Sequence, residues 1–420
     1  MLAHQPFLQL QLPLVIEYMH KGVDNHISPG AEQGIIMALQ HRGRVRRIRV
    51  HAPRSEAVFR ALDGEFPNLE GLYLKIPNGP HFNWEPLRTF RTPSLRQLVL
   101  KNIICPVQSL LLTPVAGLVT LSLTNIGEPH KFSPNDLLQR LSLMPRLEIL
   151  RIGFALFSNN PAWEGQLKNL PIQTHVTLPY LRRFLFDGTI TYLEKFFPHI
   201  STPPLEKFQV YISNWKANSV PKILKPMSGS KNFGSYSTDL MFLEKGVFVR
   251  ANLFDGTRWS ALSISLHGDD FTWQVQSAAR FFTIYGTCFS TTKYLTIHCR
   301  MPTRKEPRVG PDREQWHELF QAFHNVNALF VYDGSNGEIS RYFQMNRGNS
   351  PIELFPSLKQ LSIHTQSKYH FDPYAQFVNA RKSVGYPVHL AILGRPSATK
   401  VAISCEAWEA HWLRGSFRLR

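Results

Sequence analysis

The chain has 420 residues, of which 43% are apolar and only 18% are charged, so its composition excludes a disordered protein. A single compact core stops growing at about 250–300 residues, and the chain is therefore expected to form several domains or one elongated array. Its net charge of +17 leaves three classes of partner open: nucleic acid, an anionic surface, or an acidic protein.

The first 40 residues are expected to form a cap-like segment. Phe7–Leu12 alternates apolar and polar residues and predicts a strand, whereas Pro13–Lys21 predicts the start of a helix. A basic leader region and a cleavage site are absent from this segment, and no run of 18 uncharged apolar residues occurs anywhere in the chain. We therefore expect neither a signal peptide nor a membrane span.

A dense basic run follows at residues 42–49. Apolar Val45, Ile48 and Val50 interrupt the arginines, so the run predicts a strand with one basic face. Such a face can be a solvated structural surface or a dedicated binding patch, and the solvated surface is the commoner of the two.

The pattern P-x-L-x-x-L-x-L then recurs along the chain. Its first leucines lie 23 to 34 residues apart through the first half, and most of these spacings match the period of leucine-rich repeats, about 20–29 residues. A late copy begins at Pro356, and the copy at Leu118 lacks the proline. The first leucines are Leu69, Leu95, Leu118, Leu147, Leu181 and Leu205.

Each copy predicts a short strand, because its second and third apolar residues alternate with polar positions. Leu98, Leu121, Leu150 and Phe184 are expected to stack in successive repeats. The intervening segments have helical spacing, as in Glu56–Leu62 and Ser133–Leu143, where Ser133 is the expected N-cap and Pro134 the first helical residue. A single strand–helix unit cannot bury its apolar face, so stacked units share one continuous core.

Weaker copies occupy the second half at Trp259–Ile264, Tyr294–Ile297 and Leu329–Val331. The pattern lapses at residues 212–258, which form either an irregular stretch of the array or a boundary between two sub-arrays. Within it, Lys225–Ser237 is expected to be a long loop. The helices expected late in the chain are Asp312–Phe323 and Ala375–Val384, and the last expected strand is Val388–Ile392.

These elements predict an α/β fold of the leucine-rich-repeat solenoid type. It would be a curved horseshoe with a parallel sheet of about ten to twelve strands on its concave face, and with helices and irregular turns outside. Parallel pairing is expected because each strand connects to the next by a crossover of the same sense. The expected organisation is a cap-like segment at 1–40, the array at 41–395, and a capping tail at 396–420.

The repeated blocks resemble the leucine-rich-repeat part of F-box proteins, especially the large families of mushroom-forming fungi. The resemblance covers about residues 5–395 and rests on Pro145–Leu150 with the leucine-rich helix before it, Val176–Phe184 and Arg381–Leu390. It implies the substrate-recognition array of a ubiquitin-ligase adaptor. The F-box, which docks on a Skp-type adaptor, would precede Phe7, and only six residues do so in this sequence. The sequence is expected to be either a truncated gene model or a paralogue without the box, so such docking is expected only if a box lies upstream.

No catalytic motif was found, and neither an enzyme activity, a cofactor nor a metal site is expected. His317–Gln321 resembles the zinc motif H-E-x-x-H, but Gln321 replaces the second histidine, which favours an ordinary amphipathic helix. His298 and His364 each follow a strand core and could line the concave face. With no carboxylate or cysteine spaced around them, they are expected to be ordinary surface histidines.

The expected function is a non-catalytic protein-interaction scaffold in the cytoplasm or nucleus, with a protein substrate of acidic character. The alternative is a basic solenoid that binds nucleic acid or an anionic surface, although no nucleic-acid-binding motif is present. The candidate partner-binding residues flank the inward leucines of successive strands. They are Arg47, Arg49, Tyr73, Lys75, Val99, Lys101, Arg151, Arg183, Lys207 and Tyr211.

Overall fold

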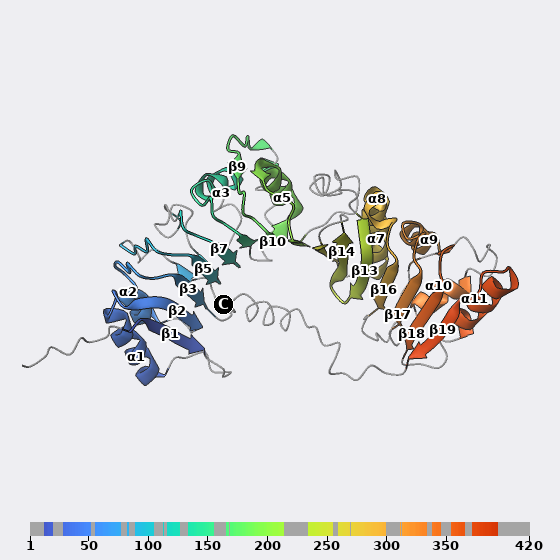
Figure 1. Cartoon of the computed structure of the whole chain (residues 1–420), viewed down its shortest axis with the longest axis horizontal. Helices are drawn as coiled ribbons and strands as arrows, with labels where there is room; N and C mark the ends of the chain where they lie inside the picture. The colour runs from blue at the N-terminus through green and yellow to red at the C-terminus, as the bar shows by residue number, and fades with distance from the viewer. Residues whose placement is uncertain are drawn as a thin grey trace, which may run out of the picture. The chain divides into compact units, whose positions relative to one another are not determined.

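A computed structural model describes most of the chain (Figure 1). The described residues are 12–19, 28–51, 55–76, 82–83, 89–104, 112, 116–126, 133–154, 165–167, 169–213, 234–254, 259–268, 270–299, 311, 313–333, 338–345, 354–365 and 372–393. The strand predicted at Phe7–Leu12 therefore lies outside them except for Leu12, as does the whole tail at 396–420.

The fold is α/β, with a mostly parallel sheet of fifteen strands. The chain divides into two compact units. The N-terminal unit comprises Met1–Gly229 with Ser260–Ile264, and the C-terminal unit comprises Ser230–Trp259 with Ser265–Arg420. The transition between them falls within the stretch 212–258, where the repeat pattern lapses.

In the N-terminal unit the sheet order is β1-β2-β3-β5-β7-β8-β10-β12, followed by the central residues of β15, and every register between neighbours from β1 to β12 is parallel. The strands are β1 (Leu14–Met19), β2 (Val45–His51), β3 (Gly71–Lys75), β5 (Gln97–Lys101), β7 (Thr120–Thr124), β8 (Ile149–Gly153), β10 (Arg183–Thr189), β12 (Lys207–Ser213) and β15 (Trp259–His267). Two further pairs of short strands are separate from this sheet. They are β4 (Phe82–Asn83) with β6 (Ile103–Ile104), and β9 (Val176–Thr177) with β11 (Ile200–Ser201).

Helices of the N-terminal unit occupy the connections between strands, and α3 and α5 lie together on one side of the strands in Figure 1. These helical elements are α1 (Pro29–Gln40), α2 (Glu56–Ala61), α3 (Pro134–Leu141), α5 (Ile190–Phe196) and the 3₁₀ turn η3 (Phe197–His199). The predicted cap of α3 is confirmed, since the Ser133 hydroxyl accepts a hydrogen bond from the Asp136 N–H at 3.1 Å and Pro134 begins the helix.

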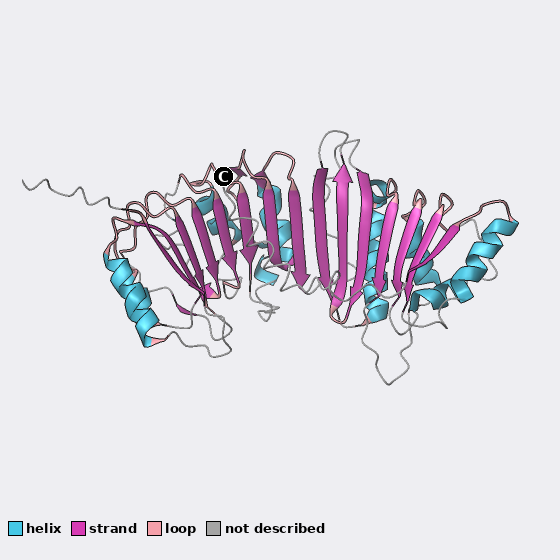
Figure 2. Cartoon of the chain, turned by 60° about the horizontal axis from the view of Figure 1, so that its bottom comes forward, coloured by secondary structure: helices cyan, strands magenta, loops and turns pink. Residues whose placement is uncertain are grey.

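The C-terminal unit continues with β14-β13-β16-β17-β18-β19. These strands are β13 (Gly234–Leu243), β14 (Gly246–Phe254), β16 (Tyr294–Cys299), β17 (Ala328–Asp333), β18 (Gln360–Thr365) and β19 (His389–Leu393). The helices are α7 (Phe271–Ile284), α8 (Gly286–Phe289), α9 (Arg313–Gln321), α10 (Glu338–Met345) and α11 (Asp372–Ser383). Figure 2 shows the helices of this unit behind its strands and beside the end of its sheet.

Three sequence-based predictions were wrong. Pro13–Lys21 was predicted as a helix, but Leu14–Met19 is strand β1, in which β-branched Val15 and Ile16 extend the chain alongside β2. The sheet has fifteen strands and is not entirely parallel, because β13 and β14 pair antiparallel through the two-residue turn Glu244–Lys245. The long loop predicted at Lys225–Ser237 ends in β13; its earlier part lies outside the described residues.

The core consists of the inward positions of the repeats, as predicted. Leu98, Leu121, Leu150 and Phe184 align in register across β5, β7, β8 and β10, and each is at most 1% exposed. The first leucines of the repeats are buried as well. Leu69, Leu95, Leu147 and Leu181 also close a turn by donating their N–H to the carbonyl of the residue three positions earlier, as Leu95 does to Thr92 at 3.2 Å. The burial pattern confirms the face assignment made from the sequence.

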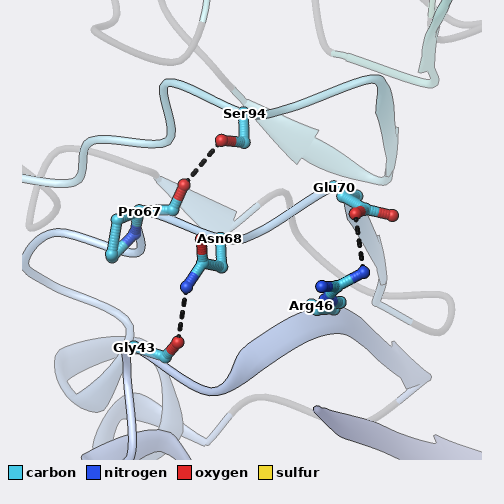
Figure 3. A network of polar contacts seen from close by, with 6 residues as sticks. All are labelled: Gly43, Arg46, Pro67, Asn68, Glu70 and Ser94. Carbon is cyan, nitrogen blue, oxygen red and sulfur yellow. Dashed lines mark hydrogen bonds and ion pairs between the residues drawn. The ribbon is translucent and has the colours of Figure 1, made fainter.

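Side chains also tie successive repeats together (Figure 3). The Asn68 side chain donates to the Gly43 carbonyl at 2.7 Å, and one repeat later the Ser94 hydroxyl donates to the Pro67 carbonyl at 2.6 Å. Beyond the strands, the amide of Asn102 donates to the carbonyl of Ile76. The amide of Asn125 in turn donates to the side-chain oxygen of Asn102 at 2.6 Å. Both asparagines have left-handed backbones, with φ of 60° at Asn102 and 53° at Asn125.

Replacing Asn102 with alanine is expected to lower the free energy of unfolding by on the order of 2 kcal/mol, because a buried hydrogen bond is lost and alanine disfavours the left-handed backbone. Urea unfolding measures the change. Asn102→Gly is the matched control, since glycine loses the same side-chain bonds but accepts a φ of 60°. A glycine variant as unstable as the alanine variant would show that the backbone conformation contributes nothing.

Candidate functional site

All ten predicted binding residues lie on one face of the N-terminal sheet, opposite its leucines. Parallel pairing arranges them in three rows across the strands. The first row contains Arg47, Arg183 and Lys207; the middle row contains Arg49, Tyr73, Val99 and Arg151; and the last row contains Lys75, Lys101 and Tyr211. We call this surface, formed by the outward positions of β1 to β12, the basic face.

The basic face carries seven basic and two acidic side chains in the described strands of this unit. The acidic ones, Glu17 on β1 and Asp187 on β10, did not appear in the prediction. Strand β7 contributes only Thr120, Ser122 and Thr124, so the cations form two groups, one on either side of it. The basic face is therefore interrupted at β7 by neutral residues.

The Arg49 and Tyr73 side chains contact each other on this face, and little of either side chain is exposed. The Arg49 guanidinium pairs with the Glu17 carboxylate at 3.0 Å and lies 5.3 Å from the centre of the Tyr73 ring. Tyr73 is only 6% exposed. Sequence reasoning places Tyr73 on the correct face but cannot show that it is covered, because that depends on the conformation of Arg49 on the neighbouring strand.

Like charges lie directly opposite one another on the basic face. Lys75 on β3 is the register partner of Lys101 on β5, and Arg183 on β10 is the partner of Lys207 on β12. Parallel neighbours are about 4.8 Å apart, and like charges opposite one another cost stability.

The residues at the second position of β2 and immediately before β3, β5, β7, β8, β10 and β12 show the opposite arrangement. Their signs alternate over most of the row, and two neighbouring pairs form ion pairs: Arg46 with Glu70 at 3.3 Å (Figure 3), and Arg182 with Glu206 at 3.6 Å. Backbone hydrogen bonds connect successive members of this flanking row. The row consists of Arg46, Glu70, Arg96, Val119, Glu148, Arg182 and Glu206. The flanking row therefore places opposite charges side by side, whereas the basic face places like charges opposite one another at two register pairs.

The corresponding face of the C-terminal unit is aromatic. His298, Tyr332 and His364 are register neighbours on β16, β17 and β18, and their rings stack with centres 4.3 and 4.2 Å apart. The sequence pattern singled out both histidines but not Tyr332. The same count of strand positions in Leu329-Phe-Val331-Tyr332 would have found it, since Tyr332 follows the second inward residue of its strand.

Near one end of that aromatic face, Tyr236 and Tyr294 are 45% and 41% exposed, with ring centres 5.2 Å apart. A hydrogen bond between the two side chains raises the pKa of Tyr236. On the same face, burial raises the pKa of Asp239, although a hydrogen bond with Thr296 and the charge of Arg250 act in the opposite direction.

The raised pKa of Asp239 predicts a specific pH dependence. Between the ordinary pKa and the raised one, the folded chain binds more protons than the unfolded chain, so the free energy of unfolding falls as the pH rises through this interval. Asp239→Asn removes that contribution. Urea unfolding from pH 4 to pH 7 should therefore show the variant gaining stability relative to the wild type as the pH rises. A difference that does not change with pH would contradict this prediction.

Among the described residues, no group of three or more His, Cys, Asp and Glu side chains is placed to hold a metal ion, and no helix is long and apolar enough to cross a membrane. The zinc-motif look-alike His317–Gln321 lies on the amphipathic helix α9, where Trp316, Leu319 and Phe320 are buried. Cys288 and Cys299 are buried in the C-terminal unit.

Comparison with known proteins adds no assignment. No protein-family model matches the chain, and no curated protein matches it.

Proposed function

We propose that the chain is a leucine-rich-repeat array that binds another protein through its basic face. Three features support the repeat: the spacing of the leucines, their burial in successive strands, and the asparagine contacts that link Ile76, Asn102 and Asn125. The array would display its outward strand positions to a partner, as extended repeat surfaces do.

One observation carries the binding proposal. Opposite charges alternate along most of the flanking row, whereas like charges face one another on the basic face at Lys75–Lys101 and Arg183–Lys207. An arrangement that costs stability is expected where a surface serves binding rather than folding. A partner with an acidic segment would complement the net positive charge of this face, and charges of opposite sign speed the encounter.

The resemblance to F-box proteins supports a more specific role for this array, as the substrate-recognition part of a ubiquitin-ligase adaptor. This role requires a helical box that binds a Skp-type adaptor. The coding sequence upstream of Met1 tests it, and an in-frame box that binds a Skp-type adaptor in a pull-down assay would support it. An upstream region without such a box would remove the ligase role and leave the binding face as proposed.

The cations of the basic face also favour a second candidate, nucleic acid, because basic surfaces bind phosphates without sequence preference. Affinity capture from an extract of the protein's own cells, before and after nuclease treatment, separates the two. We expect a captured protein that survives nuclease and is released by high salt. Complete release by nuclease would establish nucleic acid as the ligand.

A further inference from the structure

Two histidines lie side by side in the small β9–β11 sheet of the N-terminal unit. His175 immediately precedes β9 and His199 immediately precedes β11, and these two-residue strands pair in parallel register, with Val176 opposite Ile200. Nδ1 of His199 lies 3.3 Å from Nε2 of His175. Neither imidazole belongs to the basic face.

The backbone on both sides of this pair is well anchored. Val176 and Ile200 are buried beside the two histidines, and so is Phe197 in η3. Before His175, the side-chain oxygen of Asn135 on α3 accepts hydrogen bonds from the Thr174 N–H at 3.3 Å and from the Thr174 hydroxyl at 3.0 Å. The backbone therefore places the two residues side by side, with ring centres 4.5 Å apart, and His175 is exposed.

We propose that His175 and His199 form a clip for a divalent transition-metal ion of the zinc, nickel or copper type. Two nitrogens that bind one tetrahedral ion at about 2.0–2.1 Å must be about 3.3–3.4 Å apart, and the observed separation is 3.3 Å. Imidazole suits these metals, and either ring nitrogen can be the ligand. Water would complete the coordination.

A direct hydrogen bond between the rings is the competing explanation. The observed 3.3 Å is longer than most N–H hydrogen bonds, which are about 2.7–3.2 Å. Metal binding requires neutral imidazoles, and the positive charge of Lys195 acts on His199. Lys195 opposes any bound cation, so we expect an exchangeable ion rather than a structural one.

Calorimetric titration of the full chain with Zn²⁺ tests the clip. His175→Gln and His199→Gln should each weaken the binding of one equivalent of Zn²⁺ by at least about tenfold. Even the loss of residues that only contact metal ligands lowers metal affinity by about 10–100-fold. His324→Gln is the matched control, because His324 is also exposed but lies outside the clip, and it should leave this binding unchanged. Far-UV circular dichroism confirms that each variant is folded.

A second measurement needs no variant. The electron paramagnetic resonance spectrum of the wild-type chain with one equivalent of Cu²⁺ should show coupling to two imidazole nitrogens. Clip variants that bind Zn²⁺ as tightly as the wild type, or a wild-type chain without saturable binding, would overturn the proposal. Both measurements use the isolated chain, so their failure leaves the proposed protein binding untouched.

Discussion

Replacing Lys75, Lys101 and Lys207 together with glutamate is expected to weaken binding of the native protein partner by at least about a hundredfold, because three attractions become repulsions. These lysines lie on β3, β5 and β12, at outward positions of the basic face. Arg49 is left unchanged because its guanidinium contacts Glu17 and Tyr73, and its reversal would disturb the fold as well as the surface.

The matched control is the triple variant in which Arg91, Arg140 and Arg146 become glutamate. It changes the net charge by the same amount, but these arginines lie outside the outward positions of the sheet. Surface plasmon resonance with the captured partner compares the two variants, and thermal melting verifies folding. An equal loss of affinity in both would mean that net charge matters and the location of the charge does not. Unchanged binding by the lysine variant would remove the basic face as the binding surface.

The largest loss of stability is expected from Phe184→Ala, about 3–5 kcal/mol, because it opens a cavity in an aromatic cluster. Phe184 is fully buried, and its ring centre lies 4.8, 5.6 and 6.4 Å from those of Phe197, Phe208 and Phe196. Phe184→Leu keeps most of the volume and should lose less than half as much. Urea unfolding measures both variants.

The effect of Phe184→Ala should also be local, since repeats couple mainly to their neighbours. Hydrogen exchange should accelerate first in β8 and β12, the register neighbours of β10, and only later in β2. A uniform acceleration over the whole N-terminal unit would contradict a repeat array and would indicate a single cooperative core.

The inward face of the sheet could be predicted from the sequence because leucine spacing alone decides it. Burial of Leu98 and Leu150 requires only that strand residues alternate. The hairpin of β13 and β14 could not be predicted in this way, because its position depends on a two-residue turn inside a stretch without repeats. Gly246 at that turn lets the carbonyl of Leu266 approach closely; a Cβ there would lie 2.2 Å from that oxygen.

For the same reason, the sequence predicts which residues lie on the basic face. It predicts only part of how these residues contact one another. The alternation that buries the leucines also places Lys75 and Lys101 outward, but their direct opposition depends on register between strands separated in sequence. The covering of Tyr73 and the pairing of Arg46 with Glu70 depend on side-chain conformation across repeats. The sequence of a single repeat therefore cannot predict these contacts between repeats.

Photo-crosslinking from Val99 tests most directly whether the basic face binds a protein. Val99 lies in the middle row, partly exposed, between Tyr73 and Ser122, so a photoreactive residue there samples the face without removing a charge. Gln139, exposed on α3, is the control position. We predict a crosslink from position 99 to an acidic segment of one protein and none to that protein from position 139. Crosslinks to nucleic acid alone, or equal crosslinks from both positions, would contradict the proposed function.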